Sequence, residues 1–247
     1  GKSTLLKAVF GLIKPDSGEI KIGGTPIVFG DTAGVISRGV GMVHQHFQLV
    51  PVMTVAENII LGDEPKRGIF INKRAAHDEI LALSKRYGLE VDPEAVIEDL
   101  PVGMQQRVEI LKALRKDVKL LILDEPTAVL TPQEIDELLG VIRNLAKSGV
   151  GIVLITHKLH EVMAVADRVV VLRGGKLVGA TSPKETDEAG LAQMMVGRSV
   201  VLQVNRTEAK RGDVVLEVKG LQVRDDRKIL SVKGVDLSLH KGEILGV

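Results

Sequence analysis

Apolar positions in the first four fifths of the chain follow two patterns, one typical of buried strands and one typical of amphipathic helices. The runs "KLLILDE" (119–125) and "GIVLITH" (151–157) are almost wholly apolar and end in polar residues. Strands of a parallel sheet that are covered on both faces have this character. Segments with a helical repeat alternate with these runs, so the sequence predicts an α/β fold.

The segment 131–149 has the clearest helical pattern. Thr131 and Glu134 predict a capping box, Pro132 suits the first turn, and Gly149 is a typical stop signal. The apolar residues of this segment then fall on one face of the helix: Ile135, Leu138, Leu139, Ile142 and Leu145.

Three further helices are expected. One covers roughly 73–88, a second covers roughly 103–116, and the capping box of Thr54 with Glu57 indicates the start of a third. In the helix at 73–88 the inner face is expected to carry four residues: Ala76, Ile80, Leu83 and Tyr87.

The pattern of apolar and polar residues changes near residue 198, which predicts a second structural unit. The stretch "RSVVLQVNRTEAKRGD" is polar in its second half, and the residues after it alternate as strands joined by turns. We therefore expect a first domain over 1–205, a linker over 206–212 and the opening strands of a second domain over 213–247.

Composition narrows the possible partners. The 247 residues include 33 Lys and Arg and 32 Asp and Glu, a balance that offers no electrostatic case for nucleic acid. There are no cysteines, which excludes disulfides and zinc-thiolate sites. No apolar run reaches the roughly 18 residues of a membrane span, so any link to a membrane is expected to run through a partner.

The first four residues, Gly1, Lys2, Ser3 and Thr4, match the second half of the phosphate-binding pattern G-x-x-x-x-G-K-[ST]. In such a loop backbone N–H groups cradle phosphates, Lys2 would reach the β- and γ-phosphates, and the Ser3 hydroxyl would bind Mg²⁺. An ordinary helix start explains this tetrapeptide equally well when it is taken alone.

Three polar residues beyond apolar runs are candidates for chemistry. Asp124 suits a carboxylate that holds Mg²⁺ through water, and Glu125 beside it could act as a general base. The amide of Gln45 could contact both the ion and the attacking water. A plain turn after each strand is the alternative. The pair His44 and His46 lacks nearby carboxylate or cysteine partners, which disfavours a metal site there.

Two more candidates follow in the chain. Gly103 lies near the start of a predicted helix, where backbone N–H groups could meet an anion. His157 follows the second buried run, where its side chain could contact a γ-phosphate. A lone histidine at the end of a strand is more often structural.

The order of these motifs resembles the nucleotide-binding domain of ABC transporters, over residues 1 to about 197. The matching motifs are the end of Walker A at 1–4, the Gln45 loop, the signature loop at 100–107, Walker B at 120–125, the D-loop at 128–131 and the switch histidine His157. The resemblance implies a P-loop NTPase fold, with a RecA-like core whose first strands are missing and a helical subdomain at about 54–116.

The resemblance also assigns roles. It implies ATP binding by Gly1, Lys2, Ser3, Thr4, Gly103 and Gln105, and Mg²⁺ binding by Ser3, Gln45 and Asp124. Glu125 would be the catalytic base, His157 the γ-phosphate sensor, and Gln45 a further catalytic residue. In this family two domains close head to tail, so each ATP lies between one Walker A and the opposite signature loop.

Two departures from the family pattern indicate a branch. Pro101 stands where the signature loop usually has a serine, and Thr131 stands where the D-loop usually has an aspartate. Both resemble the fused twin ATPases of simple-sugar and nucleoside importers, and "DEPTAVLTPQE" is most similar to the nucleoside branch. Because Pro101 lacks both the hydroxyl and an N–H, we expect the ATP site that it completes to hydrolyse slowly.

The implied protein is an ATPase subunit at the cytoplasmic face of the cell membrane. Its expected partners are transmembrane permease subunits, a second nucleotide-binding domain in the same full-length chain and, indirectly, an extracytoplasmic solute-binding protein, with no nucleic acid. A soluble ABC ATPase acting on ribosomes or DNA, and a P-loop kinase, are the alternatives.

The phosphate loop in this sequence lacks its front half, so we expect weak ATP binding and little hydrolysis from this chain alone. The missing strands have counterparts at 213–247. One hypothesis is that strand 243–247 docks beside Gly1, where it would cover an open sheet edge. The alternative is that these strands stay loose or swap between chains.

Overall fold

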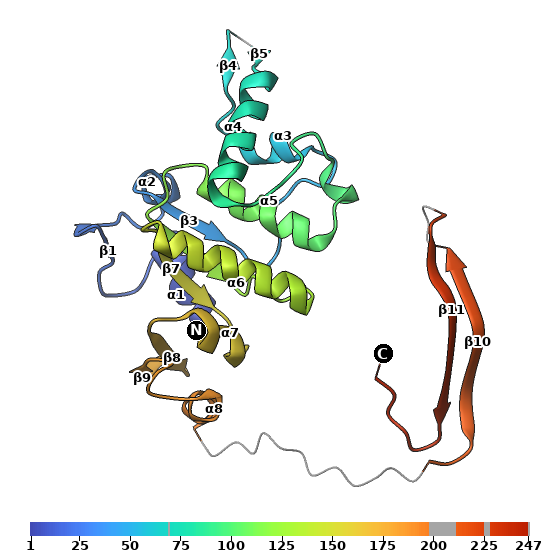
Figure 1. Ribbon diagram of the computed structural model, residues 1–247. Helices are drawn as coiled ribbons and strands as arrows, with labels where there is room; N and C mark the ends of the chain where they lie inside the picture. Colours follow the sequence, from blue (N-terminus) through green and yellow to red (C-terminus); the bar gives the residue numbers. More distant parts are fainter. Residues whose placement is uncertain (69, 198–210, 225–227, 247) are drawn as a thin grey trace. The chain divides into compact units, whose positions relative to one another are not determined.

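The computed structural model describes residues 1–68, 70–197, 211–224 and 228–246 (Figure 1). The chain forms two compact units, Gly1–Val200 and Val201–Val247. The predicted linker at 206–212 lies outside the described residues except for Arg211 and Gly212. The predicted domain limits therefore stay a prediction.

The first unit alternates helices and strands, as the sequence patterns predict. Its described helices are α1 (Lys2–Val9), α2 (Thr32–Ser37), α3 (Val55–Ile60), α4 (Lys73–Tyr87), the short 3₁₀ helix η1 (Ile97–Asp99), α5 (Val102–Leu114), α6 (Pro132–Lys147), α7 (Leu159–Val165) and α8 (Glu188–Val196). Its described strands are β1 (Lys21–Ile22), β2 (Thr25–Pro26), β3 (Val40–Val43), β4 (Lys66–Arg67), β5 (Phe70–Ile71), β6 (Leu120–Asp124), β7 (Gly151–Ile155), β8 (Val169–Arg173) and β9 (Lys176–Thr181).

Strands β3, β6 and β7 form a parallel sheet in that order, with β6 in the centre. Successive residues of β6 point to opposite faces, so the strand contributes to two apolar clusters. Leu121 and Leu123 pack with helices α3 to α6, whereas Ile122 packs with Leu6 and Phe10 at α1. The two predicted strands and the parallel sheet are thus confirmed.

Strand β7 is less covered than its apolar sequence predicts. Ile155 packs into the α1 cluster, but Val153, which lies on the same face two residues earlier, is 38% exposed. α1 therefore covers only the carboxyl end of this strand. The prediction that both faces of β7 are buried is wrong, because an apolar run does not report how far the covering helix extends.

The helix predictions are confirmed, with ends that differ by at most two residues. Both capping boxes form: the Thr131 hydroxyl accepts the Glu134 N–H, and the Thr54 hydroxyl accepts the Glu57 N–H. On α4, Ala76 and Ile80 are buried and Leu83 and Tyr87 pack partly buried against the same cluster. No helix within the described ranges has both the length and the apolar character that crossing a bilayer requires.

The second unit is described as an antiparallel hairpin of β10 (Val214–Arg224) and β11 (Leu230–His240), which agrees with the predicted strands. The predicted strand at 243–247 does not form over the described residues 243–246. Instead the chain turns, because the Glu243 N–H donates to the His240 carbonyl at 3.0 Å and the Glu243 carboxylate accepts the His240 N–H at 3.0 Å. Pairing beside Gly1 stays a prediction.

Candidate functional site

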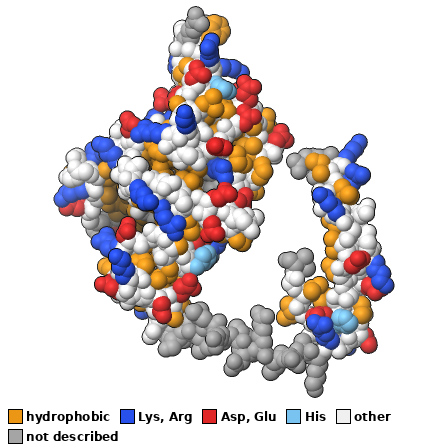
Figure 2. Space-filling view, viewed as in Figure 1, with side chains coloured by type: hydrophobic (Ala, Val, Ile, Leu, Met, Phe, Trp, Pro, Cys, Tyr) orange, Lys and Arg blue, Asp and Glu red, His pale blue; other side chains and the backbone are white. Residues whose placement is uncertain are grey.

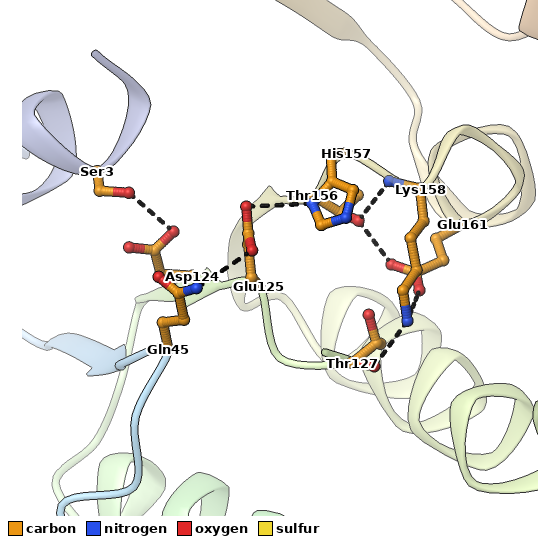
Figure 3. A network of polar contacts seen from close by, with 9 residues as sticks. All are labelled: Ser3, Gln45, Asp124, Glu125, Thr127, Thr156, His157, Lys158 and Glu161. Atoms are coloured by element: carbon orange, nitrogen blue, oxygen red, sulfur yellow. Dashed lines mark hydrogen bonds and ion pairs between the residues drawn. The ribbon is translucent and has the colours of Figure 1, made fainter. Parts of the chain in front are cut away.

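The carboxyl ends of the three parallel strands bring four of the predicted site residues to one edge of the sheet (Figure 3). Gln45 follows β3, Asp124 ends β6 with Glu125 directly after it, and His157 follows β7. Parallel strands end at the same edge, which is where α/β proteins build their sites. Residues 32 and 80 positions apart in the chain therefore meet at Glu125.

Glu125 is the centre of this cluster. Gln45 Nε2 donates to its carboxylate at 3.4 Å, and His157 Nδ1 lies 3.2 Å from the other carboxylate oxygen. The backbone of Glu125 has a φ of 49°, in the left-handed region that residues other than glycine rarely adopt. Strain at a carboxylate with converging polar partners is typical of a functional position.

Ser3 and Asp124 form a second contact beside Glu125. Ser3 Oγ donates to Asp124 Oδ1 at 3.4 Å, and the Asp124 side chain is almost wholly buried. Two oxygens bound side by side to one octahedral Mg²⁺ lie about 3 Å apart, and Mg²⁺ prefers such hard oxygen ligands. The hydroxyl of Ser3 and the carboxylate of Asp124 therefore fit Mg²⁺ by chemistry and spacing, and the amide oxygen of Gln45 fits it by chemistry.

Helix α1 presents its N-terminus to the same edge. Gly1 is the N-cap and makes no side-chain cap bond, while Lys2, Ser3 and Thr4 form the first turn. The N–H groups of a first helical turn have no partner within the helix, and the helix dipole favours an anion beside them. Leu6 and Phe10, packed on Ile122, hold the helix in this position.

His44, next to Gln45, packs its ring edge to face on Phe10, with ring centroids 6.3 Å apart. Burial lowers the pKa of His44, while the nearby Asp124 carboxylate opposes that shift. His44 thus joins the apolar cluster under α1.

Gly103 and Gln105 lie on α5 and have other contacts. Gln105 Nε2 donates to the Leu100 carbonyl at 3.0 Å, and a methyl group added at Gly103 would collide with the Glu134 carboxylate. None of the contacts described for these two residues reaches Glu125. Pro101 occupies the N-cap of α5 and offers no side-chain cap bond.

Four residues of the polar network were not selected from the sequence: Thr127, Thr156, Lys158 and Glu161. They flank Glu125 and His157 in the chain. The available signal is the spacing of Lys158 and Glu161, because opposite charges three positions apart at a helix start meet on one face. That signal is common on exposed helices, so it does not by itself indicate a site.

A comparison with protein families finds that the model described as "ABC transporter" matches residues 1–128, more than half of the chain. The chain belongs to the ABC transporter family. The motifs from the Walker A remnant to Asp124 and Glu125 lie within the matched region, whereas most of the D-loop and His157 lie beyond it.

Curated relatives in this family align with the whole chain. It is 49% identical to the nucleoside import ATP-binding protein NupA of Lactococcus lactis and 47% identical to the guanosine import ATP-binding protein NupO of Bacillus subtilis. It is 45% identical to the ribose import ATP-binding protein RbsA 3 of Rubrobacter xylanophilus. Each alignment covers 100% of this chain and 48–49% of the relative, so the chain spans about half the length of the curated relatives that it matches.

Solved structures of ABC cassettes share the fold. cbiO1 of Clostridium perfringens, part of the ABC transporter complex cbiONQ, aligns with a TM-score of 0.63 and 29% identity over 74% of this chain and 73% of its own. The dimeric ATP-binding cassette MJ0796, bound to ADP and Pi, aligns with a TM-score of 0.61 and 26% identity over 74% of this chain and 81% of its own. The predicted fold class is confirmed.

Proposed function

We propose that this ABC transporter chain forms an ATP-binding and ATP-hydrolysing domain of an importer, and that the importer takes up nucleosides. The observation that carries the proposal is the position of Glu125. Its carboxylate is contacted by Gln45 and lies beside His157, next to the Ser3–Asp124 contact and the N-terminus of α1.

In the proposed mechanism Glu125 accepts a proton from the water that attacks the γ-phosphate. Gln45 and His157 hold the Glu125 carboxylate in place, and the ring of His157 contacts the γ-phosphate. Lys2 and the first-turn N–H groups of α1 neutralise and orient the phosphates. Phosphoryl transfer requires mainly such positioning and charge neutralisation, and this cluster contains groups of both kinds.

Ser3, Asp124 and Gln45 would hold Mg²⁺. When bound, such an ion would supply positive charge to offset the negative charge of the β- and γ-phosphates. The side chains of Ser3 and Asp124 lie within contact distance of each other, as two ligands of one ion would.

The partners follow from the same proposal. Gly103 and Gln105 would face the ATP of a second nucleotide-binding domain, carried in the same full-length protein. The two nucleotide-binding domains together would drive permease subunits from the cytoplasmic face. An extracytoplasmic solute-binding protein would deliver the cargo. Nucleosides are favoured over simple sugars because the NupA and NupO proteins are more similar to this chain than RbsA 3 is. Basic and acidic side chains are interspersed on the face drawn in Figure 2, which supports a protein partner rather than nucleic acid.

The decisive variant is Glu125→Gln in the full-length protein. We expect ATP binding to remain and hydrolysis to fall about 100-fold or more, since general-base catalysis contributes roughly that factor. Glu90→Gln is the matched control, because Glu90 is exposed on the loop after α4. Hydrolysis at the unaltered rate in Glu125→Gln would overturn the proposed role.

A transport assay tests the cargo separately. Labelled nucleosides and labelled ribose are offered to the complete transporter in vesicles, and ATP-dependent uptake is expected for nucleosides. Uptake of ribose with none of the nucleosides would refute the nucleoside assignment while leaving the ATPase assignment intact.

A further inference from the structure

Beside His157 lies a polar network, buried at its centre, that the proposed catalytic set does not include (Figure 3). Its centre is Glu161 on α7, whose side chain is 0% exposed. Thr156 Oγ1 donates to Glu161 Oε2 at 2.8 Å, and Lys158 Nζ lies 3.5 Å from Glu161 Oε1. Among the described residues, Glu161 Oε1 has no hydrogen-bond partner. The charge of Lys158 is therefore its main compensation.

The same network connects the two turns that carry Glu125 and His157. Lys158 Nζ donates to the carbonyl of Thr127 at 2.7 Å, and Thr127 is almost wholly buried two residues after Glu125. The backbone N–H of Lys158 donates to Thr156 Oγ1 at 3.0 Å. Both neighbours of His157 in the chain are therefore anchored, one of them to the turn after β6.

A helix-capping role does not account for Glu161. The N-cap position of α7 is Lys158, and it makes no side-chain cap bond. The Glu161 carboxylate instead accepts from Thr156 and faces Lys158, away from solvent. Burying a carboxylate is strongly unfavourable unless it is paired and hydrogen-bonded, and an apolar residue would fill the same space at lower cost. The arrangement therefore indicates that Glu161 fixes the positions of its neighbours rather than stabilising the fold.

We propose that Lys158 and Glu161 are positioning residues for ATP hydrolysis. They tie the turn after β7 to the turn after β6, and so maintain the 3.2 Å separation between His157 and Glu125. Neither side chain is required to contact ATP. This inference rests on the proposed function of Glu125 and His157.

The test compares three variants in the full-length protein. Lys158→Met removes the cation and the donor to Thr127, and we expect kcat to fall about 10- to 100-fold, as small displacements of catalytic groups do. The KM for ATP is expected to stay within about 2-fold, because Lys158 is not required to contact ATP and its loss therefore leaves ground-state binding of ATP unchanged. Lys158→Arg keeps a cationic donor and is expected to retain most of the turnover.

The third variant, Lys158→Met with Glu161→Gln, separates positioning from stability. It removes the buried charge of Glu161 together with its half-buried partner Lys158, so the protein is expected to fold at least as well as Lys158→Met. Turnover is expected to stay low because the link to Thr127 is still missing. Lys184→Met is the matched control, since Lys184 is exposed outside the network. Hydrogen–deuterium exchange of the peptide containing 125–130 is measured in parallel and is expected to rise in Lys158→Met and not in the control.

The outcomes are distinguishable. Normal kcat in Lys158→Met, unchanged exchange at 125–130, or full recovery of turnover in the double variant would each overturn the positioning role. An unaltered protein that binds ATP without hydrolysing it would instead overturn the proposed function.

Discussion

The side chain of Asn58 anchors the loop that follows Gln45 by hydrogen bonds to the backbone of Val50. Replacing Asn58 by alanine tests how much this anchor contributes to stability. The Asn58 side chain, on α3, is 0% exposed. Asn58 Oδ1 accepts the Val50 N–H at 2.7 Å, and Nδ2 donates to the carbonyls of Val50 at 3.1 Å and Thr54 at 3.0 Å. One amide therefore satisfies both backbone groups of Val50.

The expected magnitude follows from these contacts. Each hydrogen bond contributes about 0.5–1.5 kcal/mol net, and a backbone group left buried without a partner costs about 1–3 kcal/mol. Alanine recovers roughly 0.5 kcal/mol because it is a better helix former. Asn58→Ala is therefore expected to lower the free energy of unfolding by about 2–4 kcal/mol, a large part of the roughly 5–15 kcal/mol that a domain has.

Urea unfolding followed by far-ultraviolet circular dichroism measures this loss. The described helices all lie in the first unit, so the helical signal reports that unit. Asn144→Ala is the matched control, because Asn144 lies exposed on α6 and its replacement is expected to change stability by less than about 0.5 kcal/mol. A loss below about 1 kcal/mol in Asn58→Ala, or one equal to the control, would refute the reasoning.

Two other variants test burial and helix packing. Burial raises the pKa of the Glu109 carboxyl group, and the Gln48 N–H and Lys112 oppose this shift. The proton on Glu109 therefore contributes stability that is complete below the ordinary pKa of 4.5. That contribution is lost as the pH rises through the raised pKa of the folded state. Glu109→Gln cannot ionise and still offers an acceptor, so its unfolding midpoint is expected to fall less than that of the unaltered chain between about pH 4.5 and pH 7; equal pH dependence in both proteins contradicts this. Gly140→Ala on α6 adds a methyl group into open space and is expected to stabilise the unit by about 0.5–1 kcal/mol in the same urea titration, whereas a lower midpoint than the unaltered chain contradicts this.

The site could be predicted as far as its residues lie at the ends of recognisable elements. Glu125 comes directly after β6 and His157 two residues after β7, and parallel strands end at one edge, so their meeting required no further information. Capping boxes such as Thr131 with Glu134 are local as well, since their partners lie three residues apart. The hydrophobic periodicity of an element and its caps depend on residues that are close in the chain, so both could be predicted from the sequence.

Other features depend on contacts between distant segments and were decided by the tertiary structure. An apolar run looks the same whether or not a helix covers it, so the exposure of Val153 could not be read from β7. The buried charge of Glu161 is equally hidden, because a Lys and a Glu three residues apart usually face solvent. The packing of β6 and β7 brings the Thr127 carbonyl to Lys158, and this contact links the turns that hold Glu125 and His157.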